Sequence, residues 1–149
     1  MEIHTLKLSV TEEELNSLVM ELPSGKSAVE NLRVRLTSEG IVILGDYPTM
    51  FMKMAFETLW VVRGIGSVVE ARLASVRVSG LPAGMLRGVL LKTIRDLTAH
   101  EPGVRVEEET ILVDLSKHTA VQRLRLRINL IGVSCSPEGL VIEAGPMLV

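Results

Sequence analysis

The sequence is poor in the residues from which redox, metal and catalytic sites are usually built. Its 149 residues include a single cysteine, Cys135, which excludes an internal disulfide and a cysteine-rich metal site. The three histidines, His4, His100 and His118, are far apart and have no acidic neighbours at the spacing of metal ligands. An enzyme would need such side chains to converge in one pocket, and no flanking motif indicates that they do. We therefore expect no catalytic residue, no metal and no cofactor.

The sequence also lacks a strong net charge and long apolar runs. A net charge of −2 gives no bulk electrostatic attraction to nucleic acid, so we expect no nucleic-acid partner. No segment reaches the roughly 18 consecutive apolar residues that cross a bilayer as a helix. Residues 1–7 do not show the basic region and apolar stretch of a signal peptide. We expect a soluble, cytoplasmic protein, and membrane association stays open as an alternative.

Aromatic residues are scarce, at 3% of the chain, although hydrophobic residues make up 47%. The surplus is therefore aliphatic, and it has to be buried in a core, in an oligomer interface or around an internal apolar cavity. The aromatic residues are concentrated between positions 47 and 60, together with several methionines. They are Tyr47, Phe51, Phe56 and Trp60, with Met50, Met52 and Met54 among them. This segment is the first candidate for a binding surface.

Hydrophobic periodicity and turn residues predict a single α+β domain over residues 1–149. Thr11 and Glu14 have the spacing of a capping box at the start of a helix. A break in the alternation near Ala74 or Ser75 predicts a β-bulge. We expect strands at 3–9, 32–36, 41–44, 67–79, 104–106, 111–113, 122–131 and 140–144, a loop at 45–48, and helices at 11–22 and from 82 to near 102. The helices are amphipathic and are expected to pack on a curved antiparallel sheet.

Two halves of the chain, about 1–70 and 71–149, resemble each other. A shift of 70 positions places 5–9 on 75–79 and 34–43 on 104–113, and five of these 15 pairs are identical. This predicts a duplicated β-α-β-β-β unit. Residues 50–63 fit both a strand and a helical stripe. The shift lays part of this segment over 124–130, in the most regularly alternating segment, so we expect 50–63 to be a strand.

The methionines and aromatic residues of this strand suggest a wall for an apolar ligand. Methionine is flexible and polarizable, so it adapts to ligands of varying shape. The expected wall combines one face of the strand with the apolar stripe of the second helix. Its residues are Met52, Met54, Phe56, Trp60, Leu86, Leu90 and Ile94. An ordinary core strand or a dimer interface explains the same pattern without a ligand.

Arginines recur at alternate positions of several expected strands. Arg123, Arg125 and Arg127 would lie on one face of the strand 122–131, and Arg33, Arg35, Arg72 and Arg77 repeat the theme. Guanidinium groups in a row could contact the anionic headgroups of lipids. The alternative is a solvent face on which the arginines pair with glutamates. Aromatic side chains that would stack RNA bases do not interleave with them.

Two short motifs resemble a known group. Thr11-Glu12-Glu13-Glu14-Leu15-Asn16 is similar to the T-E-x-x-L-N opening of bacterial LmeA-like phospholipid-binding proteins and their YpmS-like relatives. Val76-Arg77-Val78-Ser79-Gly80-Leu81-Pro82 resembles the v-x-v-x-G-l-P segment of the same group. The resemblance implies a relation to tubular lipid-binding proteins, in which helices on a strongly curved antiparallel sheet enclose an apolar groove, without catalytic residues. Such proteins usually begin with a signal peptide or membrane anchor, which these 149 residues do not show.

These observations together favour a non-catalytic protein that binds a lipid or other apolar small molecule in a groove between helices and sheet. Peripheral contact with anionic headgroups is a further expectation. The alternative is a homo-oligomeric structural or scaffold protein that has no small-molecule ligand.

Overall fold

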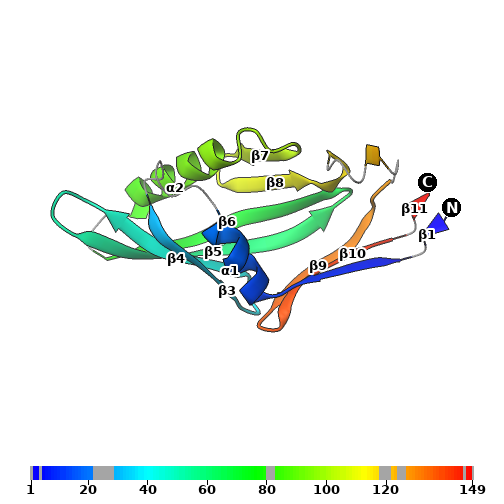
Figure 1. Ribbon diagram of the computed structural model, residues 1–149, viewed down its shortest axis with the longest axis horizontal. Helices are drawn as coiled ribbons and strands as arrows, with labels where there is room; N and C mark the ends of the chain where they lie inside the picture. Colours follow the sequence, from blue (N-terminus) through cyan, green and yellow to red (C-terminus); the bar gives the residue numbers. More distant parts are fainter. Residues whose placement is uncertain are drawn as a thin grey trace.

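The computed structural model describes residues 2–3, 5–21, 29–79, 83–117, 122–123, 127–145 and 147–148. The two α-helices of this part of the chain are α1 (Glu12–Met20) and α2 (Ala83–Leu97), and Leu115–Lys117 forms a 3-10 turn, η1. The strands are β1 (Glu2–Ile3), β2 (Leu6–Val10), β3 (Glu30–Leu36), β4 (Ile41–Pro48), β5 (Lys53–Ile65), β6 (Val68–Val78), β7 (Val104–Glu107), β8 (Thr110–Asp114), β9 (Leu130–Ser136), β10 (Gly139–Ala144) and β11 (Met147–Leu148). Helices packed on antiparallel sheets confirm the predicted α+β class (Figure 1).

Within the described ranges, the strands divide among three antiparallel sheets. The largest has the order β3-β4-β5-β6-β8-β7, a second has the order β2-β10-β9, and β1 pairs with β11. The predicted bulge is confirmed, because Leu59 pairs with Ser75 and Trp60 with Leu73, which leaves Ala74 without a cross-strand partner. The loop predicted at 45–48 is wrong, because β4 continues through Pro48 in register with β5. The hairpin of β4 and β5 is therefore paired up to Pro48 and Lys53, and only residues 49–52 form its turn.

The strand prediction for residues 50–63 is confirmed from Lys53 onward, and residues 49–52 form the turn before β5. Burial alternates along this strand. Phe56, Thr58 and Trp60 are buried, and the residues between them are partly exposed. This alternation is the two-residue period of a strand with one face turned to the core. We call the face that carries these three side chains the core face of the six-stranded sheet.

Two clusters of buried side chains cover the core face. Val29, Phe56, Leu86 and Leu90 form the first, beneath α2. The second contains Val34, Leu36 and Leu140, with Leu15, Val19, Val133 and Cys135 packed around them. One end of the core face is therefore closed by α2, and the other by α1 and the three-stranded sheet.

A glycine allows the three-stranded sheet to approach β5. A Cβ atom at Gly64 would lie 2.9 Å from Val133 Cγ2 and 3.1 Å from Leu130 Cδ1. The Leu130 amide also donates to the Gly66 carbonyl over 2.7 Å, which ties the start of β9 to the turn after β5. Close packing of backbone on side chains at this point makes the two sheets one continuous core.

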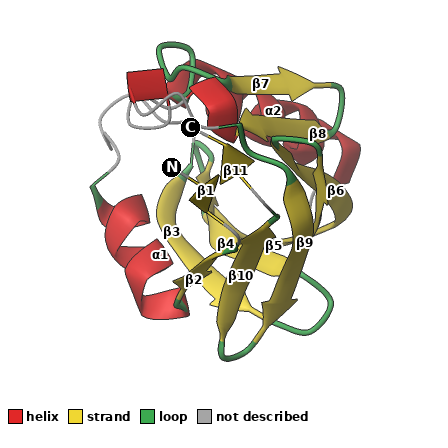
Figure 2. Cartoon of the chain, turned by 90° about the vertical axis from the view of Figure 1, so that its right-hand side faces the viewer, coloured by secondary structure: helices red, strands yellow, loops and turns green. Residues whose placement is uncertain are grey.

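Helix α1 begins with the predicted capping box. The Glu14 amide donates to Thr11 Oγ1 over 3.1 Å, and the Thr11 amide donates to Glu14 Oε1 over 3.2 Å. The helix lies along β3, which is one of the two edge strands of the six-stranded sheet (Figure 2). Asn16 accepts from the Val34 amide at 2.7 Å and donates to the Val34 carbonyl at 2.8 Å, and Glu12 accepts from the Leu36 amide at 2.7 Å. Side chains of α1 thus replace a neighbouring strand at this edge.

The strand predicted at 122–131 is wrong over most of its described part. Residues 122–123 are helical, residues 127–129 lie outside any strand, and 124–126 lie outside the described residues. The strand begins at Leu130 because its partner β10 ends at Ala144, which pairs with Leu130. Alternation gives a segment the capacity to form a strand, but the segment still needs a partner to receive its hydrogen bonds.

The duplication of two units stays a prediction. Leu124 and Leu126, which the shift lays over Met54 and Phe56, lie outside the described residues. No described helix is long and apolar enough to cross a membrane.

Replacing Gly88 with alanine is expected to raise the free energy of unfolding by about 0.5–1 kcal/mol. Gly88 is an exposed residue in the middle of α2, and a Cβ atom there would meet nothing within 4 Å. Alanine restricts the unfolded chain and adds no clash, so the helix gains stability. Urea unfolding measures the change. The control is Gly103→Ala, which places a Cβ atom 2.6 Å from the Asp114 carbonyl oxygen at φ +81° and should lower stability. A lower midpoint for the Gly88 variant would contradict the packing of α2 described above.

Candidate functional site

An apolar cavity of about 150 Å³ lies between α2 and the core face of the six-stranded sheet. Helix α2 contributes the stripe predicted from its periodicity, and β5 contributes Thr58 and Trp60. The end of α1, the residue before β3, and strands β3 and β4 contribute the other described lining residues. The lining residues are Val19, Val29, Leu32, Ile43, Thr58, Trp60, Leu90, Thr93, Ile94, Leu97 and Thr98.

The polar atoms around the cavity are hydrogen-bonded to the protein itself. Trp60 Nε1 donates to Thr58 Oγ1 over 2.9 Å, and Thr58 Oγ1 donates to the Ile43 carbonyl over 3.0 Å. On α2, Thr93 Oγ1 donates to the Val89 carbonyl over 2.8 Å and Thr98 Oγ1 to the Ile94 carbonyl over 2.7 Å. Threonine hydroxyls that bond to their own helix leave their methyl groups to face a neighbour. The cavity wall is therefore apolar although three threonines contribute to it.

These features determine what the cavity can hold. A water molecule inside a protein needs two to four polar partners, and the buried polar side-chain atoms among the described residues already have hydrogen-bond partners in the protein. An apolar cavity of this size stays dry and accepts a molecule such as benzene or xenon. Pockets for drug-sized ligands are larger, at roughly 300–1,000 Å³. The cavity suits a small apolar molecule, held by shape and burial without an orienting hydrogen bond.

The structure brings three of the predicted wall residues to the cavity: Trp60, Leu90 and Ile94. Phe56 and Leu86 are buried beside it, in the first core cluster. The two predicted methionines lie elsewhere. Met54 is a half-buried residue near the start of β5, where it pairs with Tyr47, and Met52 is exposed in the turn. The predicted wall therefore divides into cavity lining, adjacent core and exposed turn.

The sequence contained a signal for some of the lining residues that were not predicted. Thr93 and Leu97 belong to the apolar stripe of the second helix, and Thr58 shares the face of Phe56 and Trp60. They were left out of the predicted wall because Thr58 and Thr93 are polar and Leu97 is at the end of the helix. Leu32 belongs to the alternating apolar face of the strand predicted at 32–36, whereas Val29 precedes β3 and carries no such signal.

None of the described residues that line the cavity is ionisable. Burial raises the pKa of the Cys135 thiol, which a hydrogen bond with the Thr37 backbone lowers in part, so the nucleophilic thiolate is disfavoured. His100 is exposed in the turn after α2, and His4 and His118 lie outside the described residues. Hydrogen bonds from Ser116 and Ser67 lower the pKa of Asp114 despite a contribution from burial that raises it. The described residues contain no cluster of His, Cys, Asp and Glu suited to a metal ion.

The face opposite the core face carries the arginines of β3 and β6. Arg35 Nη2 lies 2.6 Å from Glu57 Oε1, and Arg77 pairs in register with the same glutamate. They line a hollow of about 310 Å³. Pairing of Arg35 with a glutamate matches the alternative reading of a solvent face. The prediction that Arg123, Arg125 and Arg127 form a row on one strand is wrong, because Arg127 is not in a strand. Arg125 lies outside the described residues. Headgroup contact at the other arginines stays a prediction.

No protein-family model, curated protein or solved structure matches this chain. The cavity and its surroundings, rather than a relative, therefore support the functional proposal.

Proposed function

We propose that this chain is a non-catalytic binding protein that takes an apolar ligand between α2 and the six-stranded sheet. The observation that supports this most strongly is the apolar cavity of about 150 Å³ between α2 and the sheet. Cores are normally packed to the density of organic crystals, with few voids larger than a water molecule. An unfilled space of this size lowers stability, because its lining loses dispersion contacts, and a bound apolar ligand would restore them.

The ligand that fits is small. The volume admits a molecule about the size of benzene or one end of an aliphatic chain, and a whole phospholipid is far too large for it. Burial supplies the affinity, since each buried CH₂ contributes about 0.8 kcal/mol. The resemblance to LmeA-like proteins favours an apolar ligand as well. The elongated groove that this resemblance implies is larger than the cavity between α2 and the sheet.

Benzene is expected to raise the thermal unfolding midpoint of the wild-type chain. At a concentration ten times its Kd, a ligand that binds only the folded state adds about 1.4 kcal/mol of stability. For a chain of this size, such a gain shifts the midpoint by a few degrees. The filled variant Ile94→Phe should lose this shift, because the larger side chain occupies the space that benzene takes.

The matched control for this experiment is Thr93→Val. Valine has nearly the shape of threonine, so it keeps the cavity volume while it removes the hydroxyl that bonds to Val89. The control should retain the shift caused by benzene. Equal shifts in the wild type and in Ile94→Phe would count against binding in this cavity.

A homo-oligomeric scaffold is the second candidate, and strand β2 favours it. This strand is at the edge of its sheet, and Leu6 and Leu8 on it are about half exposed. Edge strands with exposed apolar side chains are ready to pair with another chain. Light scattering at micromolar concentration separates the candidates, because a scaffold requires an oligomer and the cavity does not.

A further inference from the structure

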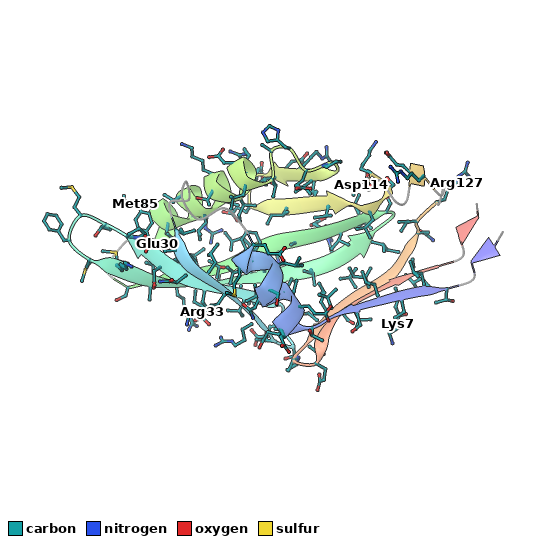
Figure 3. All side chains as sticks on the ribbon, viewed as in Figure 1. Lys7, Glu30, Arg33, Met85, Asp114 and Arg127 are labelled. Atoms are coloured by element: carbon teal, nitrogen blue, oxygen red, sulfur yellow. The ribbon has the colours of Figure 1, made fainter. Side chains whose placement is uncertain are left out.

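The turn between β4 and β5 exposes a group of large apolar side chains. Met50 is 95% exposed, Phe51 93% and Met52 60%. Figure 1 shows this turn at one end of the long axis of the molecule, beyond the start of α2, with β1 and β11 at the other end. Met85, in the first turn of α2, is 63% exposed and lies toward the same end (Figure 3). We call these four side chains the apolar tip.

Three backbone amides of this turn, those of Thr49, Phe51 and Met52, are hydrogen-bonded within the turn. The Thr49 amide and its hydroxyl both donate to the Met52 carbonyl over 2.8 Å. The amides of Met52 and Phe51 donate back to Thr49 Oγ1, over 3.2 Å and 3.4 Å. Backbone donors that are paired within a turn can leave water at little cost, which an apolar medium requires. The tip therefore carries its apolar side chains on a backbone that is prepared for such a medium.

The tip is also uncharged. No residue from 48 to 52 is ionisable, and the first charge along β5, on Lys53, is paired with Glu30 at 2.9 Å. The hydrogen bond to Glu30 raises the pKa of Lys53, so the lysine keeps its positive charge, and the Glu30 carboxylate balances that charge. Contact with a surface through the tip would depend on apolar burial and not on attraction between charges.

We propose that the apolar tip inserts into the interfacial layer of a lipid bilayer. A stable protein–protein interface takes roughly 800 Å² from each partner, which a projecting four-residue turn and one helical residue cannot supply. A bilayer needs no such complementary surface, because each apolar side chain that enters it contributes by itself. Phenylalanine and methionine at the end of a narrow hairpin fit the depth of 5–10 Å that interfacial anchors reach. The proposal does not depend on the cavity.

Flotation with phosphatidylcholine vesicles tests the insertion. The double variant Met50→Ser/Phe51→Ser should lower the vesicle partition coefficient at least about tenfold, because each side chain loses most of its burial. The matched control is Leu18→Ser/Ile131→Ser, which removes two other apolar side chains that are more than half exposed. The control should bind vesicles like the wild type, and added salt should change neither result. Ile94→Phe should also bind normally, which separates this proposal from the cavity.

A second readout locates the tip in the bilayer. In Phe51→Trp, the new indole should shift its emission to the blue with vesicles and be quenched by nitroxide-labelled lipids. Trp60 is 2% exposed, so the wild type provides the blank for both signals. Absence of wild-type flotation, or an equal loss in the control pair, would overturn the proposal. So would self-association without vesicles that Met50→Ser/Phe51→Ser abolishes, because a second copy would then be the occupant of the tip.

Discussion

Replacing Gly40 with alanine is expected to lower the free energy of unfolding by about 3 kcal/mol, at the upper end of the cost of overpacking. Gly40 is in the turn between β3 and β4, where it exchanges backbone hydrogen bonds with Thr37 over 3.0 Å and 3.3 Å. An added Cβ atom would lie 2.1 Å from the Trp60 carbonyl oxygen and 3.0 Å from its carbonyl carbon. These are backbone atoms of the central strand, which cannot rotate away as a side chain would.

The control for this prediction is Gly66→Ala. Gly66 has a φ of +61°, which costs an L-residue about 1 kcal/mol, but nothing lies within 4 Å of its Cβ position. The difference between the two variants in urea unfolding isolates the steric contact with β5. A Gly40 variant no less stable than the Gly66 variant would show that β4 and β5 pair more loosely than described. The Gly40 variant also bears on the cavity, because displacement of Trp60 would alter the cavity lining.

Replacing Asn16 with leucine is expected to cost about 2–3 kcal/mol. Leucine keeps the size of the side chain but cannot bond to the Val34 amide and carbonyl, which Asn16 contacts at 2.7 Å and 2.8 Å. Each partly buried polar group that loses its partner costs about 1–3 kcal/mol, and water at the groove beside α1 recovers a part of this. Because the edge of β3 would then be open, the variant should also associate more readily at high concentration.

Ser17→Ala is the matched control for Asn16. The Ser17 hydroxyl also bonds to a backbone carbonyl, that of Glu13 at 3.1 Å, but it is exposed and makes no described contact with β3. Its loss should change stability by less than about 0.5 kcal/mol. Equal effects of the two substitutions would mean that Asn16 acts only within its helix and that α1 does not protect the edge strand.

The sequence predicted those elements whose pattern is local. The capping box of Thr11 and Glu14 and the alternation of Phe56, Thr58 and Trp60 are each properties of a few consecutive residues. Residues 122–131 alternate as well as any strand in the chain, yet β9 begins only at Leu130. The extent of that strand depends on the length of β10, which is a tertiary property that no window of the sequence contains.

The same distinction explains the cavity. Trp60, Leu90 and Ile94 were predictable because each belongs to an apolar face of one element. The contribution of Val29 depends on how the chain enters β3, and the role of Asn16 depends on where α1 lies relative to that strand. Met52 was expected on the strand face of Trp60, because the strand was predicted to begin at residue 50. The strand begins at Lys53, so Met52 lies in the turn before it, at the surface.

Quenching of Trp60 by bromobenzene tests most directly whether the cavity binds a ligand. The chain has one tryptophan, it lines the cavity, and bromine quenches indole fluorescence only at close range. Binding in the cavity predicts saturable quenching in the wild type and a Kd at least about tenfold weaker in Ile94→Phe, a loss of about 1.4 kcal/mol. Quenching that rises linearly with bromobenzene and is identical in the two proteins would contradict the proposed function.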